Sequence, residues 1–288
     1  MKRSQCDRDE TYDWEDHWMP SRGAKAIAAL TLAASVLTGA PAAGADAAPD
    51  PVAAMQRQLV KGHGVRINDR FTINDGGQGG WDRGQPEKGI VGFGNGKIVA
   101  TDLRYYHTAK SSTRTICIGK RAWEYRPKGL PKGKTWLAYE SVQRLAVGSG
   151  HIRLDDPATF RAVLATTTSR RAASTYDGTR TTLYEGTITF GQLLDANPAK
   201  DFYFLKQGSE SEYTAWTISW RLWIGRDQLV HRAWSKWREP ETKPFNGMTE
   251  GQGWFGYIND VRFSDWGMRA DIQPPPPGRS ITSKKLMR

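Results

Sequence analysis

The 288-residue chain contains only two cysteines, Cys6 and Cys117. So few thiols exclude a disulfide framework, and the fold must depend on a hydrophobic core. No apolar run approaches the roughly 20 residues that cross a bilayer, which excludes a polytopic membrane protein. The motifs of serine hydrolases, zinc peptidases and phosphate-binding loops are absent, and the histidines are spaced too irregularly for a metal motif. We therefore expect no enzymatic activity, no metal and no cofactor.

The composition that remains is that of a folded protein with a basic surface. Hydrophobic residues make up 38% and charged residues 25%, so there is enough apolar material for a core. Lys and Arg number 41 against 30 Asp and Glu, which gives a formal charge of +11. No RNA-binding, zinc-finger or helix-turn-helix pattern accompanies this charge, which argues against nucleic acid. An anionic cell-envelope surface is the partner that the charge favours, and an ordinary solvated surface is the alternative.

The N-terminal region resembles a secretory signal. A small and apolar run from Ala26 to Ala40 follows two basic residues and is too short to span a bilayer comfortably. Small residues suitable for a signal peptidase place cleavage near Ala45 or Ala47. Residues 1–18 carry six acids against three bases, whereas such a region is normally basic. Either Met19 is the true initiator, or the signal has a long N-terminal extension.

The sequence predicts three parts: an N-terminal extension with signal peptide (1–47), one folded domain (48–277) and a disordered basic tail (278–288). Cleavage after residue 45 would leave 36 bases and 24 acids, a charge of +12. Because no cysteine stands just after the apolar run, where a bacterial lipoprotein would be acylated, we expect no lipid anchor. The mature protein is predicted to be secreted and monomeric, without a transmembrane span.

Two helices are predicted by an acid followed by proline, a typical helix start. Asp50-Pro51 precedes apolar residues at helical spacing, and Asp156-Pro157 begins a second such pattern that extends to about Ser169. A third, short helix is predicted at 190–194 and ends before Asn197-Pro198.

Between the helices, alternating patterns predict antiparallel strands separated by hairpin-sized turns. The expected strands are 65–73, 97–106, 113–125, 135–139, 179–188, 216–224, 229–237 and 256–264, with a glycine-rich loop at 75–89. The clearest is 216–224, where Trp216, Ile218, Trp220, Leu222 and Ile224 occupy every second position. One face of that strand is therefore apolar and large.

Three segments resemble the LolA/LppX-like family of bacterial exported proteins, especially lipoproteins of the LppX and LprAFG type. They are Tyr176–Ile188 (YDGTRTTLYEGTI), Trp223–Arg232 (WIGRDQLVHR) and Val261–Pro275 (VRFSDWGMRADIQPP). The resemblance implies an α+β fold with a curved open antiparallel sheet, a half-barrel, whose concave face is covered by helices. It also implies a cavity for a lipid or another apolar ligand. This chain departs from the family in lacking the lipobox cysteine, and in having Gly225, Gln228 and Val230 where the hairpin motif has Asp, Gly and Pro.

A ligand wall would be built from the apolar faces of the strands and the second helix. The candidates are Leu103, Tyr105, Ile116, Ile118, Phe160, Ile218, Trp220 and Leu222. An ordinary close-packed core is the alternative for the same residues. Trp81, Trp254 and Trp266 adjoin glycines and are candidates for a ligand at the rim. Cys117 lies between two isoleucines, which indicates a buried residue rather than a nucleophile.

Two interpretations of function follow. In the first, the protein is a secreted, non-enzymatic carrier for an acyl or isoprenoid-like molecule. In the second, it is an envelope-associated interaction or sensor module with a filled core and a basic convex surface.

Overall fold

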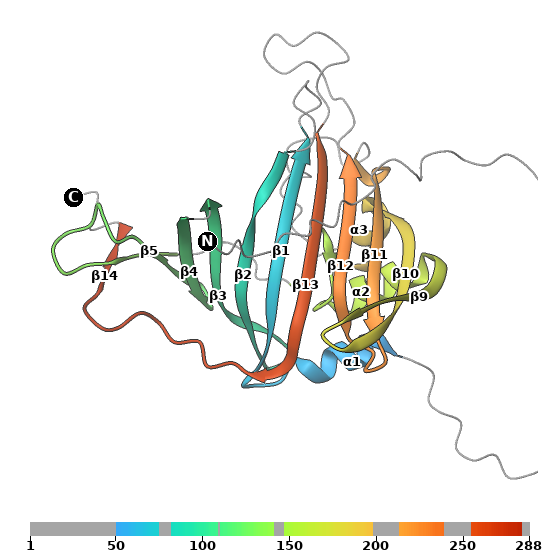
Figure 1. The fold of residues 1–288 in the computed structure, drawn as a ribbon, viewed down its shortest axis with the longest axis horizontal. Coiled ribbons are helices and arrows are strands. Elements are labelled where there is room, and N and C mark those ends of the chain that lie inside the picture. The colour runs from blue at the N-terminus through green and yellow to red at the C-terminus, as the bar shows by residue number, and fades with distance from the viewer. Residues whose placement is uncertain are drawn as a thin grey trace, which may run out of the picture. The chain divides into compact units, whose positions relative to one another are not determined.

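The computed structural model describes residues 50–74, 82–108, 110–140, 147–197, 213–238 and 255–283. The predicted signal peptide, its cleavage sites, the choice between Met1 and Met19, Trp81 and Trp254 lie outside the described residues. One large sheet dominates the described part of the chain (Figure 1).

Twelve strands form this sheet, in the order β14-β6-β5-β4-β3-β2-β1-β13-β12-β11-β10-β9. They are β1 (His63–Asn74), β2 (Asp82–Gly94), β3 (Lys97–Thr108), β4 (Ser111–Ile118), β5 (Arg121–Tyr125), β6 (Trp136–Glu140), β9 (Thr167–Tyr176), β10 (Thr179–Thr189), β11 (Thr217–Gly225), β12 (Val230–Arg238), β13 (Gly256–Arg269) and β14 (Ser280–Thr282). All neighbours are antiparallel except β14 and β6, which are parallel. Two short strands, β7 (Gly148–Ser149) and β8 (Ile152–Arg153), form a separate pair. The sheet is curved and unclosed, so the predicted α+β class with an open antiparallel half-barrel is confirmed.

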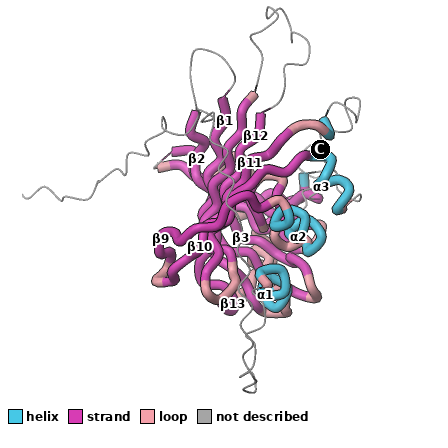
Figure 2. Tube along the Cα trace, turned by 90° about the vertical axis from the view of Figure 1, so that its right-hand side faces the viewer, coloured by secondary structure: helices cyan, strands magenta, loops and turns pink. Residues whose placement is uncertain are grey.

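Three described helices begin where the sequence predicts them. In α1 (Pro51–Gln58) and α2 (Pro157–Ala165), the preceding aspartate accepts a hydrogen bond from a backbone N–H of the first turn. α3 (Phe190–Ala196) begins with a capping box between Thr189 and Gln192. Figure 2 shows all three helices on the same side of the sheet. We call the concave face that they cover the inner face, and the opposite face the outer face.

The main core lies between these helices and the inner face. Phe160 and Val163 of α2 and Leu193 of α3 pack in one cluster with Ile218 and Trp220 of β11, and all five are nearly or fully buried. Burying a side chain of this size stabilises the fold by about 1.5–3 kcal/mol. The alternation that identifies β11 in the sequence is therefore the pattern of a strand with one face in the core.

Glycines permit the close approach of strands in the curved sheet. A Cβ added to Gly89 of β2 would lie 2.0 Å from the carbonyl oxygen of Asp102 on β3, and one added to Gly186 of β10 would lie 2.2 Å from the carbonyl oxygen of Thr166. Only glycine fits such approaches without a shift of the backbone.

Four parts of the chain differ from the prediction. The glycine-rich stretch 82–89, predicted as loop, belongs to β2, because its glycines allow close pairing with β1 and β3. The single strand predicted at 113–125 is a hairpin, since Gly119 turns the chain with a positive φ. α2 ends at Ala165 and is followed directly by β9. Residues 280–282, placed by the sequence in a disordered tail, pair with β6 as β14.

Candidate ligand-binding face

The register of the strands shows which residues share the inner face. One row of directly paired residues crosses the sheet on the same face as the core residue Leu222. It consists of Tyr184, Leu222, Ala233, Val261, Asp69, Glu87, Tyr105 and Thr113. Paired residues in an antiparallel sheet point to the same side. The inner face therefore continues without interruption from the core to β3 and β4.

Four of the eight predicted ligand residues meet in the core. Phe160, Ile218, Trp220 and Leu222 belong to one cluster and are at most 1% exposed. The indole N–H of Trp220 donates a 3.1 Å hydrogen bond to the hydroxyl of Thr166. Side chains packed in this way support the helices against the sheet and present no accessible surface to a ligand.

The other four residues divide between the two faces. Leu103 and Tyr105 lie on the inner face, on β3. Ile116 and Ile118 of β4 pair with Asp102 and Ala100, so they lie on the outer face. The structure therefore does not bring these four side chains to one wall. Ile116 is buried and Ile118 is half-buried, but both point away from Leu103.

Large aromatic rings are exposed on the inner face. Phe71, Tyr105, Tyr139 and Phe255 are each between 36% and 40% exposed. Strand pairing places three of them on the inner face, because Phe71 pairs with Asn259, Tyr105 with Glu87 and Tyr139 with Ala122. In Figure 1 the three helices lie by β9–β12 and the ends of the central strands, whereas β3, β4 and β5 stand apart from them. Leu103 and Tyr105 thus lie on a part of the inner face that no described helix covers.

Two of these rings continue an aromatic stack that begins in the core. Trp237, which is buried, stacks on Tyr257 with ring centroids 5.1 Å apart. Tyr257 in turn stacks on Phe71 at 5.9 Å and on Phe255 at 6.4 Å. The stack leads from the closed core to exposed rings, so the apolar surface does not end where the core ends. Phe71, Tyr139 and Phe255 were not among the predicted ligand residues; only Phe71, which lies between Arg70 and Thr72, alternates with polar residues in the sequence.

Two acids lie between Phe71 and Tyr105 on the inner face. Asp69 and Glu87 are directly paired across β1 and β2. Burial and then the neighbouring Glu87 together raise the pKa of Asp69 to about 7, although a hydrogen bond with Asn259 opposes the shift. Burial also raises the pKa of Glu87. Oδ1 of Asp69 is buried and has no hydrogen-bond partner among the described residues. In mildly acidic conditions this part of the inner face therefore carries little charge.

Cys117 and Tyr139 lie close together farther along the inner face. Cys117 is buried, as predicted for a strand residue between isoleucines. Burial raises the pKa of Tyr139, and Cys117 and Glu124 raise it further.

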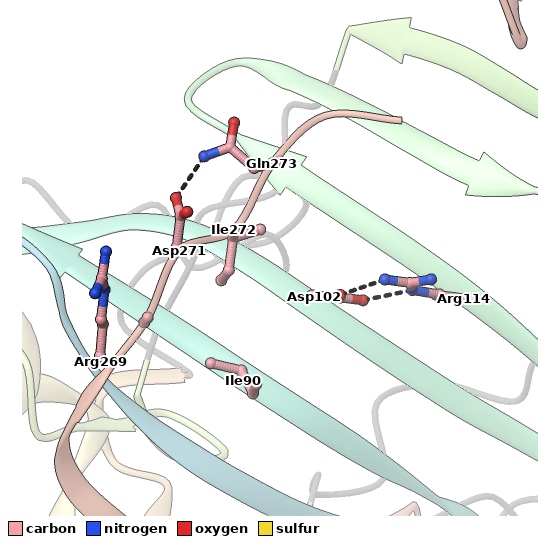
Figure 3. Close-up of a pocket in the computed structure, with 8 residues that line it drawn as sticks. Ile90, Asp102, Arg114, Arg269, Asp271, Ile272 and Gln273 are labelled. Atoms are coloured by element: carbon pink, nitrogen blue, oxygen red, sulfur yellow. Dashed lines mark hydrogen bonds and ion pairs between the residues drawn. The ribbon is translucent and has the colours of Figure 1, made fainter. Parts of the chain in front are cut away.

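The outer face has a cleft of its own. The chain after β13 crosses β2–β4, and a cleft of about 490 Å³ opens between this segment and the sheet. Figure 3 shows Ile90, Asp102 and Arg114 on the sheet side and Ile272 on the crossing segment. Arg114 donates two hydrogen bonds to Asp102, at 2.8 and 2.6 Å, and lies 5.6 Å from the ring of Trp136. The cleft thus has a mixed polar and apolar lining, and Arg114 within it is already paired with Asp102. The proline-rich run 274–277 was interpreted as a terminus, so the sequence did not reveal this crossing.

No three His, Cys, Asp or Glu side chains of the described residues lie together as they would around a metal ion. None of the described helices is long and apolar enough to cross a membrane.

No known family model matches the sequence, and no curated protein matches it. Among solved structures, the chain is similar to LprF from Mycobacterium bovis, with 12% identity, a TM-score of 0.38 and coverage of 78% of this chain and 95% of that chain. It is also similar to lipoprotein LppX from Mycobacterium tuberculosis (14% identity, TM-score 0.40, 79% and 100% covered). A third is a LolA superfamily protein from Nitrosomonas europaea (11% identity, TM-score 0.26, 76% and 94% covered). These are the kinds of protein that the sequence motifs resemble, but likenesses this weak do not assign the chain to a family.

Proposed function

We propose that this chain is a non-enzymatic binding protein that holds a hydrophobic, lipid-like molecule against the inner face of its sheet. The observation that carries the proposal is the exposure of Phe71, Tyr105, Tyr139 and Phe255 on that face. Phe71 and Phe255 both stack on Tyr257, whereas Tyr105 lies two strands from Phe71 and Tyr139 three strands farther on. Exposed apolar side chains spread along a concave surface are typical of a site for a long apolar ligand. An acyl or isoprenoid-like chain has the shape and the chemistry to cover them.

The two acids of the inner face favour a ligand whose polar group donates a hydrogen bond, such as a hydroxyl group or the protonated carboxyl group of a fatty acid. Because burial raises the pKa values of Asp69 and Glu87, these acids carry less charge at mildly acidic pH than exposed carboxyl groups would. The unpaired Oδ1 of Asp69 can accept a hydrogen bond from a hydroxyl group of the ligand. The ligand is therefore expected to be apolar over most of its length, with a polar group near β1 and β2.

We further propose that the protein acts outside the cytoplasm as a secreted monomer. The support is the apolar run Ala26–Ala40, which precedes small residues suitable for a signal peptidase. Membership of the LolA/LppX-like family stays a prediction of the sequence motifs.

The two faces of β3 and β4 provide a matched test. Leu103 and Ile118 are both half-buried aliphatic residues, but they lie on opposite faces. The full chain is titrated with the fluorescent fatty acid 11-(dansylamino)undecanoic acid, as wild type, Leu103→Gln and Ile118→Gln. We expect Leu103→Gln to weaken binding by about tenfold, since a polar amide replaces apolar contact area of roughly one side chain. Ile118→Gln is expected to bind like the wild type.

Circular dichroism establishes that both variants are folded. Equal weakening by the two variants, or no binding to the wild type, would contradict the proposal.

An interaction module with a filled core is the competing function, and the charges of the outer face favour it.

A further inference from the structure

A row of cations crosses the outer face of the sheet. The residues that pair directly along this row are Arg171, Leu183, Trp223, Arg232, Arg262, Asn68, Lys88, Arg104 and Arg114. We call them the cationic row. With strands about 4.8 Å apart, it extends over roughly 38 Å from β9 to β4. The charges are separated by many residues in the sequence, and only the register brings them into line.

The cationic row places like charges directly opposite each other. Arg232 pairs with Arg262, Lys88 with Arg104, and Arg104 with Arg114. Like charges in such positions destabilise a sheet. A local conflict of this kind is expected where a site serves binding rather than stability.

Only part of this repulsion is neutralised within the protein. Arg232 donates two hydrogen bonds to Asp260, at 2.7 and 2.6 Å, and Arg114 is paired with Asp102. Lys88, Arg104 and Arg262 are exposed and form no ion pair with any described residue. Three positive charges of the cationic row are thus available to an anion.

Both basic and acidic side chains lie beside the cationic row on the outer face. Arg66, Arg70 and Arg221 are exposed there, each two residues along its strand from a member of the row. Arg66 is paired with Asp265 and Arg221 lies near Glu185, whereas Arg70 forms no ion pair with a described residue. Arg70 therefore adds a further positive charge to those of the row.

The shape and side chains of the outer face favour a chain-like anion over a membrane. The outer face is convex, so a flat bilayer would meet only a part of the row, whereas a flexible polymer can follow all of it. The large apolar residue within the row, Trp223, is only 9% exposed and has the guanidinium of Arg232 4.6 Å from its ring centroid. It is not available for insertion between lipids. Guanidinium groups bind phosphate oxygens in a bidentate manner.

We propose that the cationic row binds a flexible linear polyanion that carries repeated phosphate groups, which lies across the strands of the outer face. This binding is separate from the ligand of the inner face and does not depend on it. The polymer would supply the negative charges that the row lacks, with its phosphates nearest Arg262, Lys88 and Arg104.

The test uses long-chain inorganic polyphosphate as the probe and the full chain as the protein. The triple variant Lys88→Gln, Arg104→Gln, Arg262→Gln removes three charges from the row. The control Lys120→Gln, Lys128→Gln, Lys132→Gln removes three exposed charges from turns outside the row, so both variants have the same net charge. Dissociation constants are measured by fluorescence anisotropy with end-labelled polyphosphate between low and moderate salt concentrations.

The row variant is expected to bind about tenfold more weakly at low salt, and the control within about twofold of the wild type. The slope of log affinity against log salt should fall by about 2 in the row variant only, because three phosphate contacts are lost. Equal weakening by both variants would overturn the proposal, since net charge alone would then explain binding. Binding of vesicles made of phosphatidylglycerol and phosphatidylcholine, without binding of polyphosphate, would overturn it in favour of a membrane.

Discussion

The inner and outer faces of the sheet differ in chemistry although the same strands build both. On β12, Ala233 and Ser235 point to the buried inner face, and Arg232, Trp234 and Lys236 to the outer face. On the inner face Trp237, Tyr257 and Phe71 stack on one another, whereas on the outer face the ring of Trp234 lies beneath Arg221 at 4.9 Å. One face is therefore adapted to apolar contact and the other to anions.

The difference also affects the ionisable groups. On the inner face, burial raises the pKa values of Asp69 and Glu87, which favours their uncharged forms. On the outer face, burial and then the neighbouring Arg221 lower the pKa of Lys236. The second shift is mainly the cost of burying an ammonium group, and the neighbouring positive charge adds to it. A single sheet can thus separate two environments by the alternation of its strands.

The largest expected contrast concerns two tryptophans on neighbouring strands. Trp220→Ala should lower the free energy of unfolding by about 4 kcal/mol, because it leaves a cavity in the core beneath α2. Trp234→Ala removes a half-buried ring of the outer face and should cost about 1 kcal/mol. Urea denaturation measures both. Similar costs would show that the core is not confined to the inner face.

Two glycines of β2 test the close packing of the strands. Gly89→Ala adds a methyl group 2.0 Å from the carbonyl oxygen of Asp102 and should cost about 3 kcal/mol, since backbone must move. At Gly92, three residues along, the same methyl group would make ordinary contact with Ile272 at 3.4 Å. Gly92→Ala should therefore be neutral or stabilising by about 0.5 kcal/mol. Thermal unfolding of both variants measures the difference, and equal effects would refute this explanation of the sheet's packing.

The pKa of Asp69 predicts a dependence of stability on pH. The unfolded state loses its proton near pH 3.8 and the folded state near pH 7, so the contribution of Asp69 falls as the pH rises between these values and is constant above them. Asp69→Asn removes this loss, and the stability of the variant relative to wild type should rise by about 3–4 kcal/mol between pH 4 and pH 8.

Asp265→Asn is the control for this titration, because Asp265 is an exposed partner of Arg66. Its effect should be small and should show no rise over the same range. Urea denaturation at pH 4 and pH 8 measures the free energy of unfolding of the wild type and both variants. A difference between Asp69→Asn and wild type that is the same at pH 4 and pH 8 would mean that Asp69 ionises normally.

The smallest expected effect is a gain in stability on the outer face. Lys88→Gln relieves the repulsion between Lys88 and Arg104 and should raise the free energy of unfolding by about 0.5 kcal/mol at low salt. High salt should remove the gain, since exposed charges are screened. Lys120→Gln, in the turn between β4 and β5, should have no such salt-dependent effect. A loss of stability in Lys88→Gln would show that Lys88 contributes to folding instead.

The elements with one fully buried face were predictable from the sequence. The alternation of Ile218, Trp220 and Leu222 predicts β11, and aspartate followed by proline predicts the starts of α1 and α2. In each case the local pattern and the burial agree. The strand 82–89 was missed because glycine and proline, which usually mark loops, occur there for close packing between strands.

The candidate site was predictable only within single strands. Leu103 and Tyr105 share a face, and so do Ile116 and Ile118, as the alternation requires. Which face of β4 matches which face of β3 depends on a register shift between Tyr106 and Thr108, where His107 is the extra residue. Without this bulge, Ile116 and Ile118 would point to the inner face with Leu103. One extra residue exchanges the two faces of a strand, and no pattern in the sequence predicted this bulge.

The central claim is that a lipid-like molecule occupies the inner face. It is tested most directly by photo-crosslinking the full chain with a fatty acid that carries a diazirine group, followed by mass spectrometry of the labelled peptides. We expect labels on β3 around Leu103 and Tyr105 and on β6 at Tyr139. An excess of unlabelled fatty acid should reduce this labelling. Labels on the outer face, or labelling that unlabelled fatty acid does not reduce, would contradict it.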